Sequence, residues 1–259
     1  MATTRVDYLL LGGGLASATA AETLRHEGAK GEILILSEES ISPYYRPFLS
    51  KEYLVRHQDP AKLQIFPESF YAQQDIRLAL NTTAVNVDTR AKTLLTSAGQ
   101  VIEYDKLLIA TGAKPKPLRI PGAHLGGIFS LRRRSEGEAI RLAAAKSKRA
   151  LVMGGSFLGM EIAMSLHHLG LEVTIVELGD RVLTHLESAR LSEYFLNFAR
   201  SQGITIHFHD EVTAINGDGH VRSATTRAGL EIPTDLVVVS IGVDPATSFL
   251  QDTDISLDR

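Results

Sequence analysis

The sequence contains no cysteine and no tryptophan. Without cysteine, these 259 residues hold no disulfide, no thiolate nucleophile, no CxxC redox pair and no Cys-ligated zinc or iron–sulfur cluster. Strong net charge is also missing: the formal value is −3, which gives no general reason to expect nucleic-acid binding. The remaining composition, 44% hydrophobic and 22% charged, is typical of a globular protein of about two domains.

A long hydrophobic run is missing as well. The longest apolar stretch covers residues 8–21, contains three glycines, and is shorter than the roughly 20 apolar residues that span a bilayer. The alternative is a signal peptide, with Arg5 ahead of the stretch and Ala16-Ser17-Ala18 as a cleavage site. Asp7 is misplaced for such a segment, and the glycines interrupt its apolar region. We therefore expect a cytoplasmic protein with no membrane segment.

Two classes of catalytic site find no support in the sequence. Nine histidines are scattered without acidic partners at metal-ligand spacing, so we predict no metal site. There is no G-x-S-x-G motif of the kind that carries a hydrolase nucleophile.

A strand, a glycine turn, a helix and a second strand follow one another twice along the chain. The first copy is predicted over residues 6–11, 16–27 and 33–36, and the second over 150–153, 160–169 and 173–176. Further predictions are two or three antiparallel strands over 78–104, a strand over 106–110, helices over 135–145 and 189–202, a strand over 204–207, a meander over 212–235 and a strand over 236–241. The expected fold class is therefore α/β, with two Rossmann-like βαβ domains that each carry a three-stranded β-meander.

Both glycine turns approximate G-x-G-x-x-G, in which the glycines permit a tight turn, close approach to a pyrophosphate and close helix–strand packing. The first is Gly12-Gly13-Gly14-Leu15-Ala16-Ser17, followed by the acid Glu38. The second runs from Gly154 to Gly159 with Ser156 in the middle, followed by Glu177. A turn without a ligand is the alternative for either copy alone. Two copies, each with an acid to accept ribose hydroxyls, favour two dinucleotide sites.

The acid of the second copy bears on the choice of cofactor. Glu177 would attract the ribose 2′-hydroxyl of NADH and repel the 2′-phosphate of NADPH, although Arg181 lies close enough in sequence to weaken that preference. We expect NADH, with NADPH as the less favoured cofactor.

Residues 114–149 differ from the rest of the chain in charge. They hold ten Lys or Arg and two Glu, a net charge of +8, although the whole chain is at −3. An exposed charged loop at residues 132–134 is the ordinary explanation for part of this excess. A surface of this sign would speed the encounter with an acidic protein.

The chain resembles a known family at four motifs. Residues 43–51 read Pro-Tyr-Tyr-Arg-Pro-Phe-Leu-Ser-Lys, residues 104–112 YDKLLIATG, residues 154–161 GGSFLGME and residues 237–245 VVVSIGVDP. These motifs are similar to those of the FAD-dependent pyridine nucleotide oxidoreductases, in the branch of ferredoxin and rubredoxin reductases and apoptosis-inducing-factor-like proteins. The resemblance spans nearly the whole chain and implies a glutathione-reductase-like fold.

The resemblance also implies roles for individual residues. It assigns FAD binding to Gly12, Gly14, Leu15 and Ala16 at the pyrophosphate, Glu38 at the ribose, Ala84 at the adenine, Thr111 and Gly112 along the cofactor, and Arg46, Lys51 and Arg132 near the phosphates and flavin. It assigns NADH binding to Gly154, Ser156, Leu158, Gly159 and Glu177, with Phe157, Glu161 and Gly242 beside the nicotinamide. Lys51 and Glu161 are the expected catalytic residues. The alternatives without a functional role are that Lys51 is an ordinary solvated lysine and that Phe157 packs in the core.

The implied domain division is an FAD-binding domain over 1–113 and 244–259 and an NAD-binding domain over 114–243. The family's next segment carries a Gly-Asp motif for FAD and then a small interface domain, so the FAD-binding domain is expected to be incomplete at its C-terminal end. The implied function is transfer of hydride from NADH to FAD and of electrons to a ferredoxin or rubredoxin, a small acidic partner. The alternatives are a nucleotide-binding module with little turnover, and an NADH oxidase or apoptosis-inducing-factor-like flavoprotein. Oligomeric state stays open.

Overall fold

The computed structural model describes residues 3–56 and 59–258. The chain divides into two compact units: unit 1 comprises Met1–Tyr45, Pro60–Lys114 and Asp244–Arg259, and unit 2 comprises Arg46–Asp59 and Pro115–Val243. The segment Arg46–Asp59 differs from the predicted division, which placed it in the first domain. It belongs with unit 2 because its helix α2 (Glu52–Arg56) packs against α4 and α5 of that unit.

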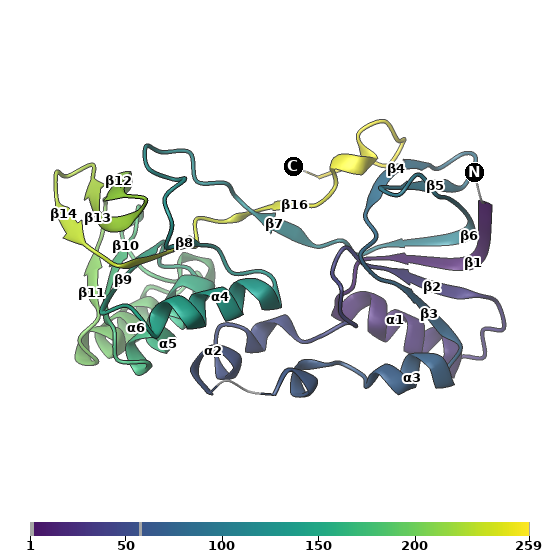
Figure 1. Cartoon of the computed structure of the whole chain (residues 1–259), viewed down its shortest axis with the longest axis horizontal. Helices are drawn as coiled ribbons and strands as arrows, with labels where there is room; N and C mark the ends of the chain where they lie inside the picture. Colours follow the sequence, from purple (N-terminus) through teal and green to yellow (C-terminus); the bar gives the residue numbers. More distant parts are fainter. Residues whose placement is uncertain (1–2, 57–58, 259) are drawn as a thin grey trace. The chain divides into compact units, whose positions relative to one another are not determined.

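Unit 1 is built on one six-stranded sheet with the order β3-β2-β1-β6-β5-β4 (Figure 1). The strands are β1 (Thr3–Leu11), β2 (Ile33–Leu36), β3 (Ile76–Ala79), β4 (Ala84–Asp88), β5 (Thr93–Thr96) and β6 (Val101–Ile109). Strands β3, β2, β1 and β6 are parallel, and β4 and β5 continue the sheet antiparallel. Helices α1 (Leu15–His26) and α3 (Glu68–Gln73) lie along one face of the parallel strands.

The parallel strand β2, near the middle of the unit 1 sheet, is wholly apolar because both of its faces are packed. All four residues of β2 are buried. Alternate positions divide between two clusters: Leu34 packs with Val87 and Leu94 on the meander side, whereas Ile33 and Ile35 pack on the side of α1 and α3. The period-two alternation of each strand therefore decides which layer each side chain enters.

Two strand predictions for unit 1 need correction. The predicted strand over 106–110 is the second half of β6, a single strand of nine residues. Its first half pairs antiparallel with β5, while nearly its whole length pairs in parallel with β1, so one strand serves both the meander and the parallel sheet. Residues 76–79, predicted in part as meander, form β3 and pair in parallel with β2.

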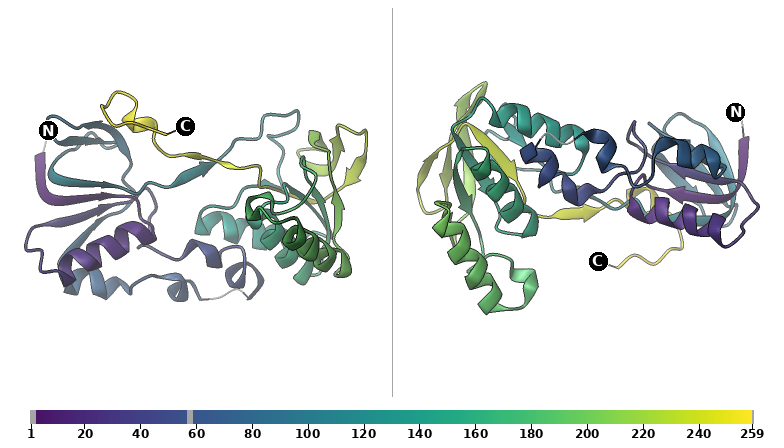
Figure 2. Two further views of the ribbon diagram at one scale, coloured as in Figure 1. Left: turned by 180° about the vertical axis from the view of Figure 1, so that it is seen from behind. Right: turned by 90° about the horizontal axis from the view of Figure 1, so that it is seen from below.

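Unit 2 contains a five-stranded parallel sheet of order β11-β10-β9-β15-β8. Its strands are β8 (Ile128–Phe129), β9 (Arg149–Met153), β10 (Glu172–Val176), β11 (Thr205–His207) and β15 (Leu236–Val239). The helices α4 (Arg134–Ala144), α5 (Phe157–His168) and α6 (Ala189–Ser201) lie on one face, and the meander β12 (Val212–Asp218), β13 (His220–Thr226) and β14 (Glu231–Pro233) covers the other (Figures 1 and 2). Met153, Val237 and Val239 pack against Val221 and Ile232 in the core beneath that meander.

Helix α5 begins one turn earlier than predicted. The sequence placed its start at Met160, after the glycine turn, but the helix begins at Phe157. The hydroxyl of Ser156 accepts a hydrogen bond from the Gly159 backbone N–H and so acts as the N-cap.

Short elements complete the chain. Within the described residues they are four 3₁₀ turns, η1 (Arg46–Phe48), η2 (Pro60–Leu63), η3 (Thr184–Leu186) and η4 (Ser248–Leu250), and the strands β7 (Ala113–Pro115) and β16 (Val243–Pro245), which pair with each other. Across residues 3–56 and 59–258, no helix combines the length and the apolar character that a membrane crossing requires.

Candidate functional site

The first glycine turn lies between β1 and α1 and is fixed by its neighbours. Gly12 donates its backbone N–H to the Leu36 carbonyl at 2.8 Å and adopts φ +113°. A side chain there would bring Cβ within 2.2 Å of the Ala110 carbonyl oxygen, so only glycine fits. A Cβ on Gly14 would meet nothing within 4 Å. The turn is therefore tight at its first glycine and open at its third.

The N-terminus of α1 has no side-chain cap. Gly14 is the N-cap residue and offers no side chain to the first-turn N–H groups. Four N–H groups at a helix start lack intrahelical partners, and together with the helix dipole they favour an anion. The glycine turn and the uncapped helix thus have the geometry and the free N–H donors that suit a phosphate group.

The other residues predicted at FAD fall into two groups. Thr111 and Gly112 follow β6 in unit 1, where Thr111 Oγ1 donates to the Ala246 carbonyl at 2.9 Å and Gly112 adopts φ +69°. Ala84 is the first residue of β4, and Glu38 is exposed just beyond β2. Arg46, Lys51 and Arg132 belong to unit 2.

The second glycine turn repeats the geometry of the first in unit 2. Gly154 donates to the Val176 carbonyl at 2.8 Å and adopts φ +102°, and a Cβ there would lie 2.4 Å from the Ser240 carbonyl oxygen. A Cβ on Gly159 would lie 2.0 Å from the Gly154 carbonyl oxygen. Gly159 is thus the residue that lets α5 pack closely against the turn.

Glu177 stands directly behind the second turn. Its carboxylate accepts hydrogen bonds from the backbone N–H groups of Gly155 and Gly179, the latter at 2.7 Å. The two bonds fix both carboxylate oxygens, and each oxygen keeps further acceptor capacity. The side chain is therefore oriented before any ligand arrives.

A cavity of about 900 Å³ opens at the carboxyl edge of the unit 2 sheet. Its lining includes five of the predicted residues, namely Gly154, Ser156, Leu158, Glu177 and Gly242, and also Arg119, His185 and Ser240. Phe157, Gly159 and Glu161 are not among the residues that line it. A cleft of this size at the ends of parallel strands is where open α/β sheets bind nucleotides.

Ser240 is a pocket residue that the sequence motifs did not single out as a ligand. Its hydroxyl lies 3.0 Å from the Ser156 hydroxyl, so the two side chains join the end of β15 to the start of α5. Ser240 sits inside the quoted motif at residues 237–245. Its position immediately after a buried strand is the signal that would have found it.

Lys51 and Glu161, the predicted catalytic pair, meet in unit 2. Lys51 Nζ lies 2.8 Å from Glu161 Oε1 and also donates to the Pro47 carbonyl at 3.1 Å. Both side chains are partly exposed. Nearby in the same motif, Arg46 Nη1 donates to the Arg132 carbonyl at 2.8 Å, which brings two predicted flavin-side residues together.

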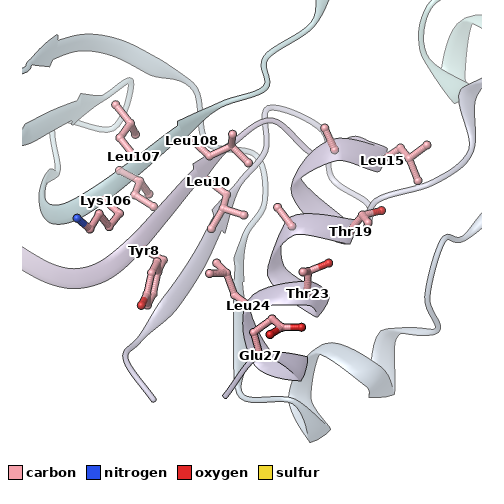
Figure 3. A pocket seen from close by; sticks show the side chains of 13 residues that line it. Tyr8, Leu10, Leu15, Thr19, Thr23, Leu24, Glu27, Lys106, Leu107 and Leu108 are labelled. Atoms are coloured by element: carbon pink, nitrogen blue, oxygen red, sulfur yellow. The ribbon is translucent and has the colours of Figure 1, made fainter. Parts of the chain in front are cut away.

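A second hollow, the α1 trench, lies in unit 1 and has a volume of about 710 Å³. Figure 3 shows Leu10, Leu15, Leu24 and Leu108 lining it, from α1 on one side and strands β1 and β6 on the other. The lining also includes Ala16, so two predicted cofactor residues contribute to this trench. Because its lining is mostly apolar, the trench itself offers little to a phosphate.

Among residues 3–56 and 59–258, no group of three or more His, Asp or Glu is arranged to hold a metal ion.

Comparison with known proteins identifies the family of this chain. The family model described as pyridine nucleotide-disulphide oxidoreductase matches residues 6–259. The chain belongs to this family. The family description names a pyridine nucleotide and a disulphide, but these 259 residues contain no cysteine to form the latter.

Individual family members give the scale of the likeness. A rubredoxin-NAD(+) reductase from Pseudomonas putida is 33% identical over 92% of this chain and 62% of its own length. The crystal structure of the ferredoxin reductase for the CYP199A2 system from Rhodopseudomonas palustris has a TM-score of 0.90 at 36% identity, covering 94% of this chain and 60% of that one. A covalent putidaredoxin reductase–putidaredoxin complex matches with a TM-score of 0.93 at 26% identity, covering 98% and 62%. The two-Rossmann fold is thereby confirmed, and the chain spans about 60% of the length of these relatives.

Proposed function

We propose that this chain binds FAD at the first glycine turn and NADH at the second. In this proposal the protein transfers a hydride from NADH to FAD, and electrons then pass from FAD to a ferredoxin, rubredoxin or similar acceptor. The observation that carries the proposal is the duplicated turn. In each copy, a glycine at positive φ lies against the carbonyl oxygen of the residue that follows a neighbouring strand. The corresponding domain assignment is FAD to unit 1 and NADH to most of unit 2.

The residues of unit 1 fit the pyrophosphate of FAD. The open space at Gly14 and the uncapped N-terminus of α1 leave backbone N–H donors for an anion. When bound, FAD supplies the chemistry that converts a two-electron donor into a source of single electrons. The protein's part is to hold that group and set its electrostatics.

Lys51 supplies a positive charge whose position is already fixed. Its ammonium has three N–H donors, and the contacts with Glu161 and the Pro47 carbonyl use two of them. A cation of this kind beside a flavin stabilises negative charge in the reduced form. We therefore assign Lys51 as the group that favours reduction and Glu161 as its anchor.

Glu177 supports NADH over NADPH. Its carboxylate is held by the Gly155 and Gly179 amides at the edge of the cavity, where it is ready to accept ribose hydroxyl hydrogen bonds. A 2′-phosphate at the same place would face a fixed negative charge. Arg181 is the nearby residue that would weaken this preference.

The electron acceptor in this proposal is a small acidic redox protein. Of the basic residues over 114–149, Arg141 and Arg149 are paired with Glu138 and Asp235, so they add little to the surface field. Lys116, Arg119, Lys146 and Lys148 are exposed in unit 2. Their positive charge would raise the rate at which an acidic acceptor encounters the protein. The reaction with such an acceptor should therefore slow as the salt concentration rises.

The test is an absorption spectrum of the purified 259-residue protein with and without added FAD, followed by anaerobic NADH titration. The proposal predicts a yellow protein that NADH bleaches faster than NADPH does. A preparation that takes up no FAD, or whose bound FAD is not reduced by NADH, contradicts it. Oxygen consumption at a rate similar to that with a ferredoxin would favour an NADH oxidase instead.

A second candidate is a nucleotide-binding module with little turnover. This candidate concerns the 259 residues taken by themselves, which span about 60% of the length of the relatives. This candidate predicts that NADH binds to unit 2 while FAD binds weakly. Calorimetric titration with each nucleotide separates the two candidates, since only the first requires tight FAD binding.

A further inference from the structure

Helix α5 holds the turn that leads into α2 at two points. Ser50 and Lys51 immediately precede α2, and Glu161 and Ser165 lie one turn apart on α5. Residues four apart share one face of a helix, so both side chains can reach the same neighbouring segment. All four residues belong to unit 2.

The contacts form a short chain of hydrogen bonds. Ser165 Oγ donates to the Ser50 carbonyl at 2.6 Å, and Ser50 Oγ donates to Glu161 Oε2 at 2.6 Å. Lys51 Nζ lies 2.8 Å from Glu161 Oε1. Each oxygen of the Glu161 carboxylate therefore has its own donor, and the two donors are adjacent residues of one turn.

The hydroxyl of Ser165 has an unusual hydrogen-bond acceptor for a serine inside a helix. Such a serine commonly donates back to the carbonyl four residues earlier, which here would be that of Glu161. Ser165 instead donates to a carbonyl that is 115 residues away in sequence. Ser165 and Ser50 are 7% and 2% exposed, so water does not readily replace either hydroxyl in this contact.

We propose that Ser165 is a positioning residue for the Lys51–Glu161 pair. By holding the Ser50 carbonyl, it fixes the peptide that joins Ser50 to Lys51. The Ser50 hydroxyl and the Lys51 ammonium are then presented together to the two oxygens of Glu161. This inference rests on the proposed function, in which Lys51 and Glu161 serve hydride transfer.

The first test needs no cofactor. Hydrogen–deuterium exchange measures the backbone amides of Lys51 and Val55, which donate to the Phe48 and Lys51 carbonyls. In Ser165→Ala we expect exchange over residues 49–56 to quicken by about five- to tenfold, the effect of losing one buried hydrogen bond. Unchanged exchange over these residues overturns the proposal.

The matched control is Ser192→Ala. Ser192 is also a helical serine, is 2% exposed, and its hydroxyl has no hydrogen-bond partner within the described part of the chain. We expect Ser192→Ala to leave exchange over residues 49–56 as in the wild type. An equal change in both variants would mean that loss of any buried hydroxyl loosens this segment, which also overturns the proposal.

The second test separates positioning from simple structural support by a double-mutant cycle on the FAD-loaded protein. Ser165→Ala should slow flavin reduction by NADH by about fivefold in the wild-type background and by less than about twofold in Lys51→Met, because the residue it positions is then gone. The same slowing in both backgrounds refutes positioning. Failure of the wild type to bind FAD or to be reduced contradicts the proposed function instead, while the exchange test still decides the link between Ser165 and Lys51.

Discussion

The two glycine turns share a backbone design but differ in the residue that stands behind them. Gly12 donates to Leu36 and Gly154 donates to Val176, so Ser37 and Glu177, which follow those acceptors, occupy equivalent places. A Cβ on Gly13 would lie 2.2 Å from the Ser37 hydroxyl, whereas Gly155 donates its N–H to the Glu177 carboxylate. Glu38, the acid of unit 1, is thus one residue farther along. Similar spacing in two copies does not give the two acids the same geometry.

The sheets of the two units also differ in how they are covered. In unit 2, three helices cover one face and a separate meander covers the other. In unit 1, the meander strands continue the main sheet, and the α1 trench remains along β1 and β6. Parallel strands are normally buried on both faces, but Leu108 of β6 is 37% exposed where it lines the trench, so the parallel strands of unit 1 are not fully covered there. The following changes test this comparison.

The largest expected effect comes from the tight glycines. Gly12→Ala should destabilise unit 1, and Gly154→Ala should destabilise unit 2, by about 3 kcal/mol or more, because each methyl meets a carbonyl oxygen at a strained φ. Urea denaturation combined with hydrogen exchange of each unit measures the effect. Gly14→Ala is the control: it should leave unfolding unchanged and weaken FAD binding. Equal destabilisation by Gly12→Ala and Gly14→Ala would contradict the assigned geometry.

Arg25 is expected to stabilise unit 1 and not unit 2, because the four carbonyls to which it donates belong to unit 1. Its guanidinium donates to the carbonyls of Gln74, Ala29, Gly31 and Asp75 at 2.7–2.8 Å. Arg25→Met should lower the free energy of unfolding of unit 1 by about 2–3 kcal/mol, because several carbonyls lose a charged donor. The control Arg5→Met removes an exposed ion pair with Asp105 and should cost less than about 0.5 kcal/mol. A similar loss in unit 2 would show that the units do not unfold independently.

Glu177 and Glu38 are expected to contribute differently to nucleotide binding, because Glu38 lies one residue beyond the position equivalent to Glu177. Glu177→Gln should weaken NADH binding about tenfold and reduce discrimination against NADPH, because a fixed carboxylate at the cavity edge is lost. Glu38→Gln should change FAD affinity by only about threefold, because Glu38 is exposed and lies beyond the equivalent position. Calorimetric titration measures both. Equal effects would mean that the one-residue displacement has no consequence for binding.

The stability of unit 2 is expected to depend on pH through the carboxyl group of Asp235. Its hydrogen bond from Arg149 lowers the pKa of this carboxyl below its ordinary value of 3.8, burial opposes that change, and the Lys148 and Arg149 amides add to the lowering. A depressed folded-state pKa contributes stability that is present above pH 3.8 and is lost as pH falls through the folded-state value.

Asp235→Asn should therefore destabilise unit 2 by about 1–2 kcal/mol at pH 7. The difference from wild type should shrink below about pH 4, as followed by denaturation at several pH values. Asp105→Asn, in an exposed pair, is the control with little expected effect. A difference that stays constant down to pH 2 would contradict the assigned role of the Asp235 carboxylate.

The smallest effect on stability is expected in the α1 trench. Leu108 is 37% exposed in the trench, and Leu142 is 52% exposed on α4. Leu108→Lys should change stability by less than about 0.5 kcal/mol while lowering the fluorescence of a bound apolar dye. Leu142→Lys should leave dye binding unchanged. If Leu108→Lys costs several kcal/mol, the trench is packed rather than exposed.

Much of the fold follows from local patterns. The positions of both glycine turns, the apolar strands behind them and the second meander were predicted because they depend on short-range signals: turn residues, apolar runs and alternation. Helix α5 begins three residues before its predicted start because Ser156 caps it. Local patterns do not predict the continuity of β6 or the parallel pairing of β3, because strand partners are set by contacts far along the chain.

The candidate site divides in the same way. Two motifs, residues 43–51 and residues 154–161, predict Lys51 and Glu161 as site residues. No spacing in the sequence indicates that the Ser165 hydroxyl reaches the Ser50 carbonyl. The placement of Arg46–Asp59 with unit 2 likewise depends on packing against α4 and α5. Neither fact has a local signal.

By itself, the sequence determined that this is a duplicated α/β chain with two glycine turns, two acids and no thiol, because composition and short motifs depend on neighbouring residues only. The tertiary structure decided which residue stands behind each turn, which unit holds Lys51 and what fixes Glu161. Those outcomes depend on a one-residue register after a strand and on hydrogen bonds between residues more than 100 positions apart. Such contacts form only when distant segments pack together.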